Sequence, residues 1–188
     1  MLGKGDRSNF TDHLQVPHVE LNGKTLGVVG YGNIGRQVIK VAQALDMKVL
    51  CYTRTPRPDQ ENLSFVSLET LLKESDYVSL HCPLNDSTRG MINAERLAMM
   101  KPSAILVNAA RGPVVSTKDL ADALNAGTIA GACLDVFDKE PPLPADEPLL
   151  AAKNTLVTPH VAFATKESMK LRAEIVFDNL KAWLEGNV

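Results

Sequence analysis

Three glycines have the residue type and spacing of a turn that binds phosphate. Gly30, Gly32 and Gly35 follow an apolar run of strand length at 25–29, and apolar residues at helical spacing continue over 33–45. In this context the first glycine permits a tight turn, the second lets a pyrophosphate approach the backbone, and the third lets helix and strand pack closely. The N–H groups at the start of the helix then face the phosphate charge. The pattern predicts a dinucleotide site.

The end of the next strand bears on which dinucleotide binds. The dinucleotide fingerprint has an acidic residue about 20 positions further on, which binds the adenosine ribose. Thr53 takes that place here, Arg54 follows it, and Arg57 is near. A carboxylate repels a 2′-phosphate, whereas threonine and arginine accept one. The charge argument favours NADP over NAD; the alternative is that both arginines are solvated surface residues, and use of both cofactors stays open.

Strands and helices alternate along the chain from Leu21 onward, and several strand candidates are almost wholly apolar, which is typical of a parallel sheet. Strands are expected at 25–29, 48–53, 64–66, 77–81, 104–108, 130–135 and 155–157, and helices at 33–45, 67–74, 93–100, 117–126 and 165–185. Ser67, and Ser116 together with Asp119, are expected to start helices, and Gly127 to end one. The alternation predicts an α/β fold, a Rossmann-type doubly wound parallel sheet with a nucleotide crevice at its strand ends.

Composition excludes several classes of function. The chain of 188 residues has a formal net charge of −2 and 45% hydrophobic residues, and no apolar run approaches membrane-spanning length. These values indicate a globular protein with neither a nucleic-acid partner nor a membrane partner. The three cysteines are odd in number and far apart. We interpret them as buried thiols of a cytoplasmic protein, not as a disulfide or a metal site.

Three further clusters lie in the second half of the chain. They are Asn108–Gly112, Leu134–Pro141 and Thr158–Ala162. Together with the glycine turn and the segment 80–84, these clusters resemble, in the same order, the nucleotide-binding domain of the D-isomer-specific 2-hydroxyacid dehydrogenases. The resemblance extends from about Leu21 to Val188. It implies an NAD(P)H-dependent oxidoreductase that interconverts a small 2-keto acid, such as glyoxylate or hydroxypyruvate, and a D-2-hydroxy acid.

The same resemblance implies that Arg111, Glu140 and His160 carry the chemistry. A guanidinium binds a carboxylate and a developing oxyanion with fork geometry, and so orients and polarises a 2-keto acid. A histidine donates a proton as hydride arrives at the carbon, or removes it in reverse. A glutamate on that imidazole orients it and stabilises its protonated form. The alternatives are a surface ion pair, a solvated carboxylate and a structural histidine.

The resemblance also implies contacts to the cofactor. Asn33 and Ile34 are expected to offer backbone N–H groups to the pyrophosphate, and Asp135 to accept from the nicotinamide amide, unless it caps a strand end. The residues expected on the adenosine side are Cys82, Pro83 and Thr88, and those expected beside the nicotinamide are Ala109, Ala110 and Asp135. The full set is Gly30, Gly32, Asn33, Ile34, Gly35, Thr53, Arg54, Cys82, Pro83, Thr88, Ala109, Ala110, Arg111, Asp135 and His160.

The resemblance implies a two-lobed enzyme in which this domain is inserted within a substrate-binding domain. We therefore expect a linker or remnant of that domain at 1–20, an NAD(P)-binding domain at 21–188, and a missing substrate-binding domain. Because a closed cleft excludes water and clamps substrate, such a fragment is expected to bind cofactor weakly and to turn over little or nothing. The full-length enzyme is expected to be a homodimer. Two other interpretations stay open: a dinucleotide-sensing co-repressor and a phosphoglycerate dehydrogenase.

Overall fold

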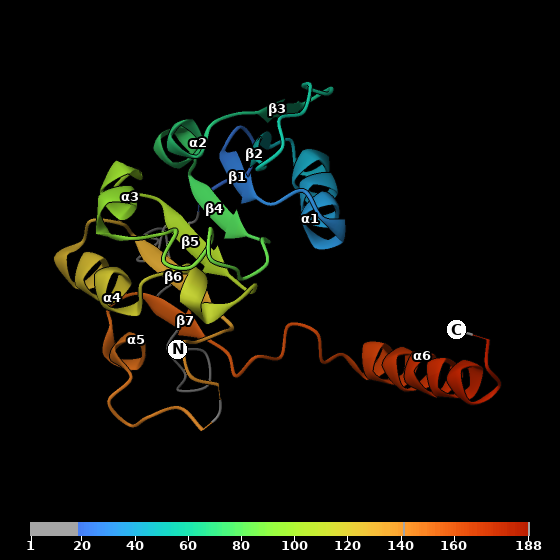
Figure 1. The fold of residues 1–188 in the computed structure, drawn as a ribbon. Coiled ribbons are helices and arrows are strands. Elements are labelled where there is room, and N and C mark those ends of the chain that lie inside the picture. Colours follow the sequence, from blue (N-terminus) through green and yellow to red (C-terminus); the bar gives the residue numbers. More distant parts are fainter. Residues whose placement is uncertain (1–18, 141, 188) are drawn as a thin grey trace, which may run out of the picture.

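A seven-stranded parallel sheet forms the centre of the molecule (Figure 1). The computed structural model describes residues 19–140 and 142–187, so most of the expected leader at 1–20 lies outside the described residues. The strands are β1 (Thr25–Val29), β2 (Lys48–Tyr52), β3 (Leu63–Phe65), β4 (Tyr77–Leu80), β5 (Ile105–Asn108), β6 (Gly131–Leu134) and β7 (Thr155–Val157). Their order is β3-β2-β1-β4-β5-β6-β7. From β1 to β3 successive strands are added on one side of β1, and from β4 to β7 they are added on the other side. The strand order therefore reverses between β1 and β4, and open α/β sheets bind ligands at such a point.

Helices cover both faces of this sheet. They are α1 (Asn33–Ala44), α2 (Leu68–Glu74), α3 (Ala94–Met99), α4 (Thr117–Ala126), α5 (Pro148–Ala151) and α6 (Lys166–Leu184), with a 3₁₀ turn η3 (Gly112–Val114). Figure 1 shows α1 on one side of the sheet and α3 and α4 on the other. Neighbouring residues of a strand point to opposite faces. Thus Val28 packs under α1 with Ile39 and Cys51, whereas Val29 joins the larger core with Leu71. The predicted doubly wound α/β sheet is confirmed.

The helix ends follow the expected residues. Ser67 precedes α2, and its hydroxyl accepts a backbone N–H of the first turn. Gly127 ends α4 in the left-handed conformation, at φ 73°. Ser116 stands before α4, but its side chain caps no N–H of the described helix. The carboxylate of Asp119 instead accepts the N–H of Ala94 at 3.1 Å, so it ties α4 to the start of α3. Ser116 and Asp119 thus stand at the start of α4 as expected, although neither caps it through a side chain.

One short helix was not predicted. The segment between β6 and β7 is rich in proline, and α5 forms near its end. Pro148 occupies the first turn, where its missing N–H has no intrahelical partner to lose. The carboxylate of Glu147 accepts the N–H of Leu149 at 3.2 Å and completes the cap. Four residues are too few for a periodic apolar pattern, so the sequence carries little signal for this helix.

The last helix, α6, extends away from the sheet (Figure 1). None of its 19 residues is buried by the described part of the chain, and its exposed side chains include Ile175, Phe177, Leu180 and Trp183. The hydroxyl of Thr165 accepts the N–H of Ser168 and caps its start. Across the ranges that the structure describes, no helix has the length and apolar character needed to traverse a lipid bilayer.

Candidate active site

In the glycine turn after β1, two glycines lie close to other backbone atoms and the third faces open space. Gly30 has a φ of 109°, and a Cβ there would lie 2.6 Å from the carbonyl oxygen of His81. A Cβ on Gly35 would collide with the carbonyl of Gly30, so both positions exclude a side chain. At Gly32 a Cβ would meet no described atom within 4 Å. The turn is therefore closely packed at Gly30 and Gly35 and open at Gly32, as a phosphate-binding turn requires.

The start of α1 fits an anion. Gly32 is the N-cap residue, and no described side chain caps the helix. The first N–H groups of a helix have no intrahelical partner, so those of Asn33 and Ile34 can hold a ligand. The side chain of Ile34 is 68% exposed, which leaves this end of the helix accessible. The open backbone in front of Gly32 fits the pyrophosphate of a dinucleotide.

A cavity of about 350 Å³ adjoins the turn at the carboxyl ends of β1, β2 and β4. Six residues of the predicted cofactor set line it: Gly30, Thr53, Arg54, Cys82, Pro83 and Thr88. The lining also includes Tyr31 and Arg57, and among its described residues there is no aspartate or glutamate. The volume is within the range of small-molecule sites. The absence of a carboxylate leaves the two arginines to set the charge of this cavity.

The loop after β4 forms the far wall of the cavity. The hydroxyl of Thr88 donates to the carbonyl of Pro83 at 2.7 Å and accepts the N–H of Asn85 at 2.9 Å, which fixes the loop. Burial raises the pKa of the Cys82 thiol, so the thiol stays protonated at neutral pH. Burial also lowers the pKa of His81, which favours its neutral form. Of these two side chains, Cys82 lines the cavity and presents an uncharged surface to a ligand.

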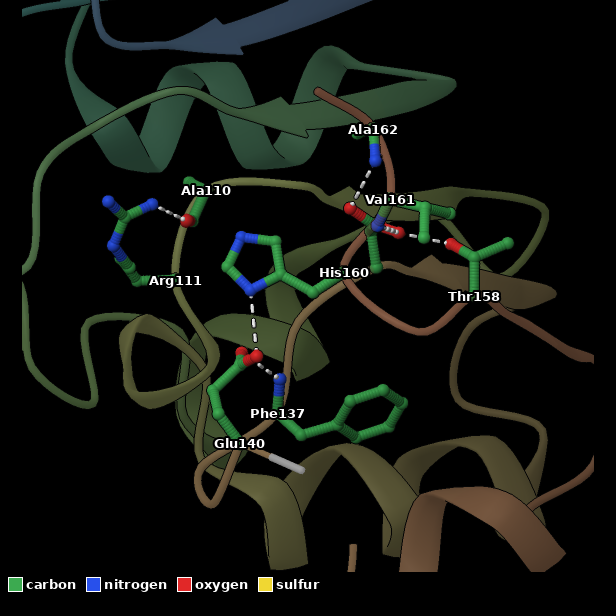
Figure 2. Close-up of polar contacts among 9 residues, drawn as sticks. Ala110, Arg111, Phe137, Glu140, Thr158, His160, Val161 and Ala162 are labelled. Carbon is green, nitrogen blue, oxygen red and sulfur yellow. Dashed lines mark hydrogen bonds and ion pairs between the residues drawn. The ribbon is translucent and has the colours of Figure 1, made fainter. Parts of the chain in front are cut away.

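The turn after β5 carries Arg111 and is held by a buried asparagine. Asn108 donates from Nδ2 to the carbonyl of Arg111 at 3.0 Å, and its Oδ1 accepts the N–H of Ala110 at 3.1 Å. The Arg111 guanidinium donates to the carbonyl of Ala110 at 2.6 Å, and its side chain is exposed (Figure 2). The next residue, Gly112, approaches the backbone of Phe137 so closely that a Cβ would overlap it. The Arg111 turn is thus packed against the loop after β6.

His160 and Glu140 form a direct pair (Figure 2). Nδ1 of His160 lies 2.7 Å from Oε2 of Glu140, and the two side chains are 33% and 42% exposed. Pairing through Nδ1 leaves the opposite nitrogen, Nε2, for a substrate. The ring of Phe163 stands edge-on to the imidazole, with centroids 5.7 Å apart. The imidazole is therefore both oriented and reachable.

Asp135, at the end of β6, holds the loop that carries the histidine. One carboxylate oxygen accepts the hydroxyl of Thr158 at 2.5 Å and the N–H of Val161 at 2.9 Å; the other accepts the N–H of Ala162 at 2.9 Å. His160, inside this loop, has a φ of 54°, a conformation that is costly for a residue with a side chain. Burial tends to raise the pKa of Asp135, but these donors outweigh it and keep the pKa below 3.8.

These bonds give Asp135 the capping role that the sequence left as an alternative. They occupy three of the roughly four acceptor positions of a carboxylate. Its expected contact with the nicotinamide amide stays a prediction.

The structure brings the predicted residues to one edge of the sheet. Arg111 follows β5, Glu140 follows β6 and His160 follows β7, and these three strands are adjacent and parallel. The glycine turn follows β1 at the same edge. The described residues contain no group of three or more His, Cys, Asp and Glu side chains that would hold a metal ion. The glycine turn and the His160–Glu140 pair at this edge suit an organic cofactor with a proton-transfer pair beside it.

The sequence-based list missed three supporting residues: Asn108, which folds the arginine turn, Thr158, which holds Asp135, and Tyr31, in the cavity wall. Asparagine and threonine at strand ends often bond to nearby backbone or side-chain groups, which is the signal that would have found the first two.

Comparison with known proteins shows the family of this chain. Residues 4–162 match the model of the D-isomer specific 2-hydroxyacid dehydrogenase family, NAD binding domain. Hydroxypyruvate reductase of Blautia hydrogenotrophica is 47% identical over 173 residues, covering 91% of this chain and 53% of that protein. Glyoxylate reductase of Thermococcus litoralis is 47% identical over 171 residues, covering 89% and 51%. The chain thus spans about half the length of these curated relatives.

A solved structure shows the same likeness in three dimensions. D-lactate dehydrogenase of Aquifex aeolicus, in complex with NAD and lactic acid, superimposes with a TM-score of 0.89 at 37% identity. The match covers 99% of this chain and 61% of that protein. The parallel sheet, the glycine turn and these likenesses agree, and the chain belongs to the D-isomer specific 2-hydroxyacid dehydrogenases as an NAD-binding domain of that family.

Proposed function

We propose that this chain is the cofactor-binding half of an NAD(P)H-dependent reductase that interconverts a small 2-keto acid and a D-2-hydroxy acid. The observation that carries the proposal is the 2.7 Å contact between His160 and Glu140, at the same sheet edge as the phosphate-binding turn. Relatives named hydroxypyruvate reductase and glyoxylate reductase support the same substrate class. Their names favour an enzyme over the co-repressor interpretation.

Each of the three side chains has a separate task in this proposal. A bound nicotinamide supplies hydride to the keto carbon, or accepts it in reverse. Arg111 binds the carboxylate and the carbonyl oxygen of the substrate, so it both orients the carbonyl and stabilises negative charge on its oxygen. His160 delivers a proton from Nε2 to that oxygen. Glu140 holds Nδ1 of the imidazole and stabilises its protonated form.

We extend the proposal to a preference for NADP over NAD. Arg54 and Arg57 line the cavity, and no described lining residue is a carboxylate that would repel a 2′-phosphate. Titration of NADH and NADPH against the wild type and Arg54→Ala tests this preference. We expect the substitution to weaken NADPH binding several-fold and to leave NADH binding nearly unchanged. An unchanged NADPH affinity would remove Arg54 from the proposal.

We also propose the setting in which the chain acts. The expected partners are the small keto or hydroxy acid and a second copy of the full-length protein, as a homodimer. A substrate-binding lobe would complete the cleft over Arg111 and His160. The three free cysteines, Cys51, Cys82 and Cys133, fit a reducing compartment, and we place the protein in the cytoplasm.

A single-turnover experiment tests the proposed chemistry even where steady-state turnover is slow. The full-length protein that contains this domain, in excess over NADH or NADPH, is mixed with hydroxypyruvate, loss of nicotinamide fluorescence is followed, and the product is resolved by chiral chromatography. We expect D-glycerate, and we expect His160→Asn to slow its formation at least about 100-fold while dinucleotide affinity is kept. L-glycerate as the product, or an unchanged rate in the variant, would contradict the proposal.

A further inference from the structure

An aromatic ring that contacts two arginines forms part of the cavity wall. Tyr31 stands between the first two glycines of the turn, and it lines the cavity together with Arg57. The guanidinium carbon of Arg57 lies 5.2 Å from the centroid of the Tyr31 ring, and that of Arg36 lies 5.9 Å away. Both distances are within the range of a cation–π contact.

The Tyr31 ring is itself held from the side of β3. The ring of Phe65 meets it edge-on, with centroids 5.2 Å apart and an interplanar angle of 81°. The Tyr31 hydroxyl donates to Oε1 of Gln60 at 3.3 Å. The ring is half-buried, whereas Arg57 is exposed. Because its partners fix the ring before any ligand arrives, the ring is a rigid support for a flexible side chain.

The charges around this support favour an anion. The ion pairs found in the described chain do not include Arg57, and the described lining of the cavity contains no carboxylate. An unsupported arginine side chain loses much rotamer freedom when it binds a phosphate. An arginine already stacked on a ring loses less, so the ring increases the affinity gained from the contact.

We propose that Tyr31 is a positioning residue that determines cofactor specificity: its ring holds the Arg57 guanidinium at the cavity, where it meets a phosphate on the adenosine ribose. The inference rests on the proposed function, because it requires a dinucleotide in this cavity. Tyr31 thereby favours NADP over NAD without touching the phosphate itself. A residue that merely walls the cavity would affect both dinucleotides alike.

Binding titrations separate these two roles. NADH and NADPH are titrated by fluorescence against the wild type, Tyr31→Leu, Tyr31→Phe, Arg57→Ala and the Tyr31→Leu/Arg57→Ala double variant. We expect Tyr31→Leu to weaken NADPH binding about fivefold relative to NADH, and Tyr31→Phe to keep most of the preference because it keeps the ring. In the Arg57→Ala background, Tyr31→Leu should cause no further loss of preference, because the ring then has no Arg57 to hold.

Three outcomes overturn the inference. Tyr31→Leu weakens both dinucleotides equally; or its effect on the NADPH-to-NADH ratio persists undiminished in the Arg57→Ala background; or the wild type has no preference and none of the variants changes the ratio. Failure of the proposed function looks different, because then the wild type binds neither dinucleotide. Denaturant unfolding of each variant ensures that only folded protein is compared.

Discussion

The two halves of the carboxyl edge of the sheet hold their functional groups by opposite means. In the nucleotide half, at the ends of β1, β2 and β4, glycines shape the backbone and leave N–H groups open. In the chemistry half, at the ends of β5, β6 and β7, the buried side chains of Asn108 and Asp135 take up backbone groups and leave few open. Holding a phosphate needs uncovered donors, whereas proton transfer needs an imidazole in one fixed orientation. The same edge of the sheet therefore holds free N–H groups in one half and a fixed imidazole in the other.

The largest effect is expected from a methyl group in the nucleotide half. Gly30→Ala combines a left-handed φ with a Cβ 2.6 Å from the His81 carbonyl. We expect it to lower the free energy of unfolding by about 3 kcal/mol or more. Gly127→Ala is the matched control, since Gly127 has a φ of 73° but no described atom within 4 Å of a Cβ. It should cost only about 1 kcal/mol in urea titrations. Equal losses would show that close packing does not set the shape of this turn.

The next effect concerns the carboxylate of the chemistry half. Asp135→Asn replaces one acceptor oxygen with an N–H₂ group that faces backbone donors, so we expect a loss of about 2 kcal/mol in unfolding free energy. Because the folded pKa lies below the ordinary 3.8, the stabilisation by Asp135 is present above that pH and is lost as pH falls through the folded value. The variant should therefore lose less stability in acid than the wild type.

Asp76 offers a control for that acid-range experiment. Its pKa is also lowered, because bonds to Lys101 and to the N–H of Thr25 outweigh the effect of burial. It lies at the opposite, amino edge of the sheet, just before β4. Asp76→Asn should change acid stability but not the single-turnover rate, whereas Asp135→Asn should change both. A normal rate in folded Asp135→Asn would show that the clamp on His160 is dispensable.

A smaller effect is expected from Glu140→Gln. The amide still contacts Nδ1 but no longer stabilises a protonated imidazole, so we expect the single-turnover rate to fall about tenfold. Dinucleotide affinity should be unchanged, because Glu140 lies in the chemistry half. Glu174→Gln, on exposed α6, is the control and should behave as the wild type. If Glu140→Gln reacts at the wild-type rate, the glutamate has no part in proton transfer.

The smallest effect concerns how stability depends on alkaline pH in the nucleotide half, whereas Asp135 acts in the acid range in the chemistry half. Burial raises the pKa of Cys51, in β2, from 9.0 to about 11, while nearby Arg57 opposes the shift. The raised pKa stabilises the fold below pH 9, and this contribution is lost as pH rises toward the folded value. Relative to Cys51→Ala, the wild type should lose about 1 kcal/mol between about pH 8 and pH 10. A constant difference in unfolding free energy would contradict the assigned burial.

The sequence allowed prediction of features with local or periodic signals. The glycine turn, the apolar strands and the cap at Ser67 each depend on residues within a few positions of one another. The contact of Asp119 with Ala94 and the clamp on the histidine loop could not be predicted this way, because they join residues more than 20 positions apart. The left-handed conformation of His160 has only a weak signal in its residue type, because histidine is enriched at positive φ but still rare there.

The projecting α6 has a consequence for how the protein unfolds. Because α6 buries no side chain, it is held by its own hydrogen bonds, its cap and a few exposed contacts such as the Lys170–Glu174 pair, and an isolated helix of this length is marginal in water. The sheet, with its two apolar cores, is far more resistant to opening. Amide protons of α6 should therefore take up deuterium within a short exposure, while those of the central strands remain protected. We therefore expect α6 to melt separately from the rest of the fold.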